Sequence, residues 1–158
     1  MDEARCSAEH VFFLLWQVGP NKTHIDAQVD SLKTRGKTAY YKAILAAVQK
    51  MHSQPPETPK WVIALTDGAD TEGGEAEVET AVELLRRTPN LNLALITMGE
   101  DADVAVLTRL AEAAMAPKPG NVRETLGKIM PADDLSAVKE AFDAIAAEMN
   151  STAGASDA

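Results

Sequence analysis

The sequence has few of the features that mark secreted or membrane-spanning proteins. It contains one cysteine, Cys6, so an internal disulfide cannot form and a disulfide-stapled scaffold is excluded. No stretch approaches the roughly 18 apolar residues that span a bilayer. The longest apolar run, VFFLLWQV at 11–18, follows mainly acidic residues and precedes no small-residue cleavage site, which is atypical of a signal peptide. We therefore expect a cytoplasmic protein with no membrane partner.

Positive charge is also scarce. Fifteen Lys and Arg stand against 24 Asp and Glu, which gives a net charge of −9. This charge is repelled by nucleic acids and anionic membranes, so we expect neither as a partner. A chain of 158 residues with 46% hydrophobic and 25% charged residues is typical of one globular domain. We expect a flexible N-terminus over 1–9, the domain over 10–149 and a disordered tail over 150–158.

The order of apolar patterns predicts strands that alternate with helices. Continuous apolar runs at 11–18, 61–65 and 91–98 are typical of buried parallel strands, an alternating segment at 23–29 suggests an exposed strand, and 122–129 fits an edge strand. Helical spacing covers about 38–51, 75–87 and 102–115. The third of these helices is expected to bury Val104, Leu107, Ala111 and Ala114.

A closing helix is predicted after Asp133, which is a plausible N-cap. Its apolar stripe should face the core and consists of Leu135, Val138, Phe142, Ile145 and Met149. Buried strands that alternate with amphipathic helices predict an α/β fold, a doubly wound and mostly parallel sheet in three layers with helices on both faces. In such sheets the functional groups lie at the carboxyl ends of the strands.

Asp67 is the first candidate residue at that edge. In WVIALTDGADTE (61–72) an apolar strand leads directly to Asp67, and Gly68 permits a tight turn beside it. A carboxylate in this position can meet a cation, or it can cap backbone amides of the loop, and the two roles are about equally expected. Further acidic residues strengthen the local negative field, although a solvated acidic face explains them more simply: Asp70, Glu72, Glu75 and Glu77.

Thr38 is the second candidate. It follows Gly36 and Lys37 and precedes a predicted helix, so its hydroxyl can cap that helix or serve as a hard oxygen ligand. Thr38 and Asp67 together supply two oxygen groups from neighbouring loops. Mg²⁺ accepts such an arrangement when water completes its octahedron.

Four segments together carry a family resemblance: GKTAYYKAILAAV, WVIALTDGADTE, LALITMGEDADVAVLTRLAEAA and ADDLSAVKEAFDAIAAEM. They resemble the later two-thirds of a von Willebrand factor type A (vWA) domain, from about Gly36 to Met149. The resemblance implies a Rossmann-like fold and a non-enzymatic protein-interaction module whose metal-ion-dependent adhesion site holds Mg²⁺ or Mn²⁺. In that family a partner carboxylate completes the coordination of the metal. By resemblance, Thr38 and Asp67 are metal ligands, and the partner-binding residues are Thr38, Asp67, Gly68, Asp70 and Thr71.

The sequence departs from the family in one respect. The Asp-x-Ser-x-Ser motif that follows the first strand in vWA domains is missing. Either 11–18 corresponds to the second strand, and the first strand and helix are missing, or 11–18 occupies the central position without the metal loop. Both alternatives leave three of the family's five ligands absent, so we expect a degenerate site that binds metal weakly or not at all.

One enzymatic alternative comes from SLKTRGKT (31–38), which resembles a P-loop whose first glycine is replaced. VIALTD (62–67) would then imitate the strand that carries a Walker B aspartate, and the protein would be a nucleotide-binding NTPase. The segment before 31–38 alternates in polarity, unlike a buried parallel strand. No other catalytic residues are predicted, because His10, His24 and His52 have no relation to a nucleophile motif.

Overall fold

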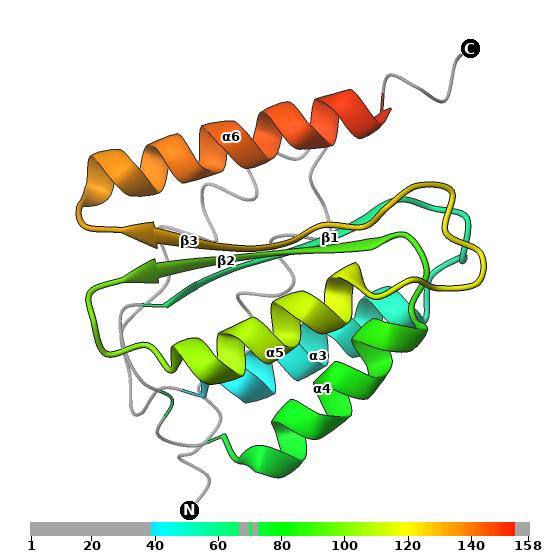
Figure 1. Cartoon of the computed structure of the whole chain (residues 1–158), viewed down its shortest axis with the longest axis horizontal. Helices are drawn as coiled ribbons and strands as arrows, with labels where there is room; N and C mark the ends of the chain where they lie inside the picture. The colour runs from blue at the N-terminus through cyan, green and yellow to red at the C-terminus, as the bar shows by residue number, and fades with distance from the viewer. Residues whose placement is uncertain (1–38, 67–69, 71–72, 154–158) are drawn as a thin grey trace, which may run out of the picture.

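The computed structural model describes residues 39–66, 70 and 73–153, which form three layers (Figure 1). Three parallel strands make the middle layer: β1 (Lys60–Thr66), β2 (Leu91–Met98) and β3 (Gly127–Ala132). One face of this sheet is covered by α3 (Tyr40–His52), α4 (Glu75–Arg87) and α5 (Val104–Met115). The other face is covered by α6 (Leu135–Ala153). The predicted α/β class with helices on both faces is therefore confirmed.

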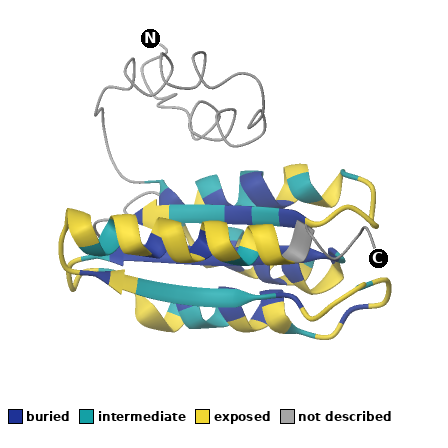
Figure 2. Cartoon of the chain, turned by 90° about the horizontal axis from the view of Figure 1, so that it is seen from above, coloured by how far each residue is buried: buried dark blue, intermediate teal, exposed yellow. Residues whose placement is uncertain are grey.

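The strand order is β1-β2-β3, which makes β2 the central strand of the described sheet. Its residues from Leu91 to Thr97 are all buried, as the dark blue of Figure 2 shows. Leu93 and Leu95 point into the cluster under α3, α4 and α5, whereas Ala94 and Ile96 pack beneath α6. A strand buried on both faces needs apolar residues at every position, which explains the unbroken run LNLALITM.

Gly127 permits the closest approach between α5 and the sheet. A Cβ atom placed there would lie 2.0 Å from the carbonyl oxygen of Ala111. No side chain fits in that space, so glycine at the first position of β3 lets α5 pack directly on the strand.

The edge strand starts later than the predicted 122–129, because asparagine side chains hold the segment before it as a loop. The amide of Val122 donates to Asn90 Oδ1 at 2.8 Å, and the amide of Leu126 donates to Asn92 Oδ1 at 2.9 Å. These side-chain bonds precede the regular pairing with β2, whose first backbone bond is donated by the Leu93 amide to the Leu126 carbonyl at 2.8 Å. β3 ends at Ala132.

The helix predicted over 102–115 starts at Val104, with Asp103 as its N-cap. The predicted burial of Val104 is wrong, since 62% of its surface is exposed. Val104 occupies the first helical position, directly after the N-cap Asp103, and is not among the buried residues of α5. The predicted burial of Leu107, Ala111 and Ala114 is confirmed.

The closing helix differs from its prediction in its cap, its length and its stripe. The side chain of Asp134, and not Asp133, accepts the amide of Ala137, at 2.8 Å. The helix continues to Ala153, so residues 150–153 of the predicted tail are helical. Only part of the predicted stripe faces the sheet: Leu135 is 78% exposed, Phe142 40% and Met149 37%. Val138 and Ile145 of the predicted stripe do contact the sheet, together with Ala141, which the prediction did not include.

Two lysines are buried at the end of the sheet where the strands begin. Lys60 Nζ donates to the carbonyls of Pro56 and Pro89. Lys118 Nζ donates to the carbonyl of Ala114 at 2.7 Å and to the Thr125 hydroxyl at 3.3 Å. Burial, with a smaller contribution from the charge of Lys60, lowers the pKa of Lys118 to about 8. The folded state therefore binds this proton less tightly than the unfolded chain does.

This difference predicts that the protein becomes more stable as the pH rises from 8 towards 9.5. The unfolded chain keeps the proton on Lys118 up to its ordinary pKa of 10.5, whereas the folded protein releases it above about 8. In Lys118→Met the increase in stability with pH should become smaller, because the titrating amine is gone. The free energy of unfolding at pH 7 should be equal or higher, because Thr125 still donates to the Ala114 carbonyl. Urea unfolding at several pH values measures this. An unchanged pH slope in the variant would contradict it.

Candidate functional site

The residues predicted to bind a metal or a partner follow the carboxyl end of β1 and precede α3. Four of them, Thr38, Asp67, Gly68 and Thr71, lie outside the described residues. Asp70 is described and half-buried. The geometry of this edge of the sheet, which we call the rim, is therefore given by Asp70 and by the residues around it.

The Asp70 carboxylate joins the loop after β1 to the start of α3. Its Oδ2 accepts the amide of Tyr41 at 2.5 Å, and its Oδ1 accepts the amide of Gly73. The N-cap of α3 is Ala39, whose side chain supplies no acceptor. Asp70 provides the missing cap from 29 residues away, and its charge also suits the positive end of the helix dipole.

This bond fixes which loops are neighbours. Thr38 directly precedes the N-cap of α3, and Asp67 lies three residues before Asp70. The contact between Asp70 and Tyr41 thus brings together the flanks of both predicted ligands. Whether the oxygen atoms of Thr38 and Asp67 converge stays a prediction.

The packing at this junction is tight. A Cβ atom at Gly73 would lie 2.6 Å from Asp70 Oδ2 and 2.8 Å from the Cβ of Tyr41. Glycine therefore allows the loop to close over the first turn of α3. The neighbouring Tyr40 hydroxyl is buried and has no hydrogen-bond partner within the part of the chain that the structure describes.

Carboxylates that follow both β1 and β2 contribute negative charge at the rim. Burial, and after it the carboxylates of Asp103, Asp70 and Glu75, raise the pKa of Tyr41. Asp103 follows β2, whereas Asp70 and Glu75 follow β1. Carboxylates that follow two successive strands thus act on one side chain at the start of α3.

The acidic residues after β1 are not simply a solvated face. Asp70 is held by two amides, and Glu77 Oε2 accepts the amide of Gly74 at 3.0 Å. Glu75 pairs with Arg109 of α5 at 2.8 Å. The solvated interpretation is wrong for Asp70, while Glu72 lies outside the described residues. Sequence reasoning missed this capping role, although an alanine at the N-cap of α3 signals that a cap must come from elsewhere.

The described residues do not form a metal centre by themselves. No cluster of three or more His, Cys, Asp or Glu side chains occurs among residues 39–66, 70 and 73–153. Both oxygens of Asp70 already accept backbone amides, so Asp70 fits a structural role better than that of a ligand. Thr38 and Asp67, which supply hard oxygen donors, stay predicted ligands outside the described residues.

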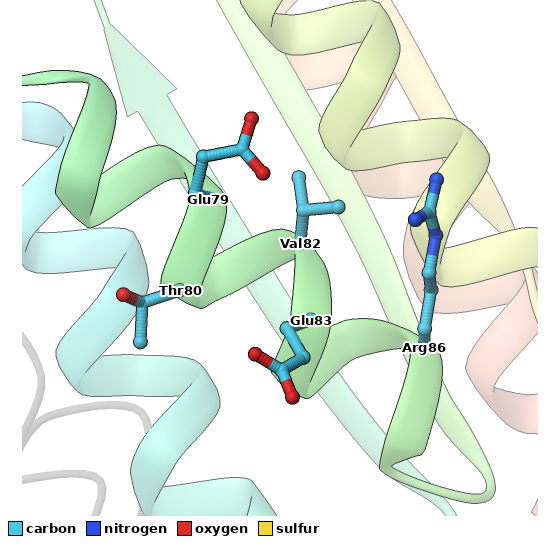
Figure 3. A pocket seen from close by; sticks show the side chains of 5 residues that line it. All are labelled: Glu79, Thr80, Val82, Glu83 and Arg86. Carbon is cyan, nitrogen blue, oxygen red and sulfur yellow. The ribbon is translucent and has the colours of Figure 1, made fainter.

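A hollow on the outer face of α4 offers no alternative site (Figure 3). Its lining comes from one helix: Glu79, Thr80, Val82, Glu83 and Arg86. Glu79 also pairs with Arg109 of α5, and the Thr80 hydroxyl donates to the carbonyl of Ala76 at 2.7 Å. These groups are engaged in holding α4 and its contact with α5.

A comparison with protein families shows which fold family this architecture represents. The family model of the von Willebrand factor type A domain matches residues 7–126. The chain belongs to this family. The match starts upstream of the predicted start at Gly36 and includes α3, β1, α4, β2 and α5, while β3 and α6 lie beyond it. A comparison with curated protein sequences gives no match.

Membership assigns the general character of the protein. vWA domains are, in general, non-enzymatic modules of protein interaction, and they often bind Mg²⁺ or Mn²⁺ at the carboxyl ends of their strands. The P-loop-like segment 31–38 lies outside the described residues. The described part of the chain contains no helix long and apolar enough to cross a membrane.

Removal of the Asp70 carboxylate should destabilise the protein by more than the loss of an ordinary helix cap. Asp70→Ala loses the cap of α3 and the tie to the loop after β1, so we expect a cost of about 2 kcal/mol, at the upper end for caps. Asp134→Ala, which removes a cap within its own helix, is the matched control, with an expected cost of about 1 kcal/mol. Urea unfolding compares the two variants. An equal loss of unfolding free energy in the two variants would show that the link from Asp70 to a distant segment adds no stability beyond that of a helix cap.

Proposed function

We propose that this vWA domain is a non-enzymatic protein-binding module that meets its partner at the rim. The contact surface comprises Thr38, Asp67, Gly68, Asp70 and Thr71. The observation that carries the proposal is the bond from the Tyr41 amide to Asp70, because it makes the loop before α3 and the loop after β1 neighbours.

The proposed partner supplies a carboxylate. A protein of net charge −9 repels acidic partners at long range, so a carboxylate can bind at the rim only where a local cation offsets that charge. A divalent ion on Thr38 and Asp67 would provide this charge, with water and the partner's carboxylate as further ligands. Since the Asp-x-Ser-x-Ser ligands are missing, we propose a degenerate site that holds Mg²⁺ or Mn²⁺ weakly until a partner binds.

Weak metal binding predicts a small stabilisation at millimolar metal. A metal concentration equal to its Kd adds about 0.4 kcal/mol to the free energy of unfolding, which is about 1–2 °C in Tm. Mn²⁺ titration followed by thermal unfolding measures the shift. Asp67→Ala should abolish it, whereas Asp101→Asn, which changes an exposed carboxylate in the loop after β2, should preserve it. If Asp67→Ala leaves the shift unchanged, or if no shift occurs, the proposed metal site is wrong.

Selection of peptides tests the partner separately. From a random displayed library in Mn²⁺ buffer, we expect the full chain to enrich peptides with a central Asp or Glu. Their binding should weaken at least about tenfold in EDTA or with Asp67→Ala, as expected when a charge-assisted contact is lost. Asp101→Asn is again the control. Enriched peptides without acidic residues, or binding that is insensitive to both changes, would overturn the proposed carboxylate partner.

A further inference from the structure

The loop that leads from α3 into β1 carries an accessible threonine. This loop, residues 53–59, lies at the end of the sheet where the strands begin, opposite the rim (Figure 1). Thr58 is exposed, as are Glu57 and Pro59 beside it. Its amide donates to the Pro55 carbonyl at 3.3 Å and closes a turn, whereas its hydroxyl makes no hydrogen bond among the described residues. A chemical change at this hydroxyl would therefore break no contact of the described fold.

A second threonine in the chain provides an internal comparison. The sequence contains two Thr-Pro pairs, at Thr58 and Thr88, and no Ser-Pro pair. A residue before proline is held in an extended conformation, so the two threonines share a local backbone preference. Thr88, however, is 1% exposed, and its hydroxyl donates to the Leu84 carbonyl at 2.6 Å and lies 2.8 Å from His52 Nδ1. Burial thus leaves Thr58 as the accessible member of the pair.

The charges beneath the turn suit an added anion. Lys60 Nζ lies 3.4 Å from the Pro56 carbonyl oxygen, which belongs to the same turn as Thr58, and donates to the Pro89 carbonyl at 3.0 Å. Lys118 lies close enough to Lys60 for their charges to repel. Both ammonium groups bind neutral oxygens, and neither forms an ion pair with a carboxylate of the described residues. A dianion near Lys60 would be a stronger acceptor than a carbonyl.

We propose that Thr58 is a phosphorylation site for a proline-directed protein kinase and that Lys60 binds the phosphate. In the transfer, Thr58 Oγ1 bonds to the γ-phosphorus of ATP, the bond from that phosphorus to the bridging oxygen breaks, and ADP leaves. The hydroxyl proton passes to the catalytic base of the kinase. The product carries about −1.5 to −2 charge at pH 7. This charge lies at the opposite end of the sheet from the rim, so the modification acts on a different surface from the proposed partner site.

Incubation of the full chain with ATP and a recombinant proline-directed kinase tests the site. Mass spectrometry should find one phosphate, on Thr58, and none on Thr88. Thr58→Ala should lose this phosphate, and Thr58→Ser should keep it. Pro59→Ala should also lose it, because the kinase selects a proline after the acceptor. A wild-type chain without phosphate on Thr58, or a folded chain phosphorylated on Thr88, would overturn the proposal.

Phosphorus NMR of the phosphorylated chain tests the contact with Lys60. Phosphothreonine has a second pKa of about 6, and a nearby cation lowers this pKa because it favours the dianion. We expect the pKa to be lower in the wild type than in Lys60→Met. Glu57 is present in both proteins, so its opposing charge cancels in this comparison.

Two further lysine variants complete this test. Lys118→Met removes only the neighbouring charge and should raise the phosphate pKa by less than Lys60→Met does, which keeps the test decisive if Lys60→Met does not fold. Lys139→Met, on the exposed surface of α6, should leave the pKa unchanged. Equal pKa values in the wild type, Lys60→Met and Lys118→Met would overturn the proposed role of Lys60.

Discussion

The rim of this vWA domain depends on one carboxylate that caps a helix from a distant loop. α3 starts at an alanine that has no side-chain acceptor, and Asp70 supplies the acceptor for the Tyr41 amide. The same side chain accepts the amide of Gly73 and so fixes the start of the turn that leads into α4. One aspartate thus joins the first turn of α3 to the loop after β1.

The sheet provides the rigid frame beneath that junction. β2 is buried on both faces and pairs on both edges, so it positions β1 and β3 together with the helices above and below them. Polar groups at the opposite end are satisfied by asparagine side chains and by lysines that bind backbone carbonyls. One end of the sheet is thus held by a closed polar network, whereas the other carries the acidic loops.

The α6 side is less complete than the α3 side. α6 covers β2 and β3 through a narrow face that includes Ala141 and Ile145, and it leaves Leu135 exposed.

The sequence by itself determined the order of the elements, because apolar periodicity depends on local burial. LNLALITM is typical of a strand covered on both faces, as observed, and the bounds of α4 followed from its spacing and its terminal charges. It also indicated the family, through the segments around Thr38 and Asp67. Tertiary structure decided which side of α6 faces the sheet. Leu135, Phe142 and Met149 recur every seven residues, as do Val138 and Ile145, so the apolar spacing alone does not distinguish the exposed positions from the buried ones. Tertiary structure also decided that Asp70 caps α3, because a hydrogen bond across 29 residues leaves no local pattern.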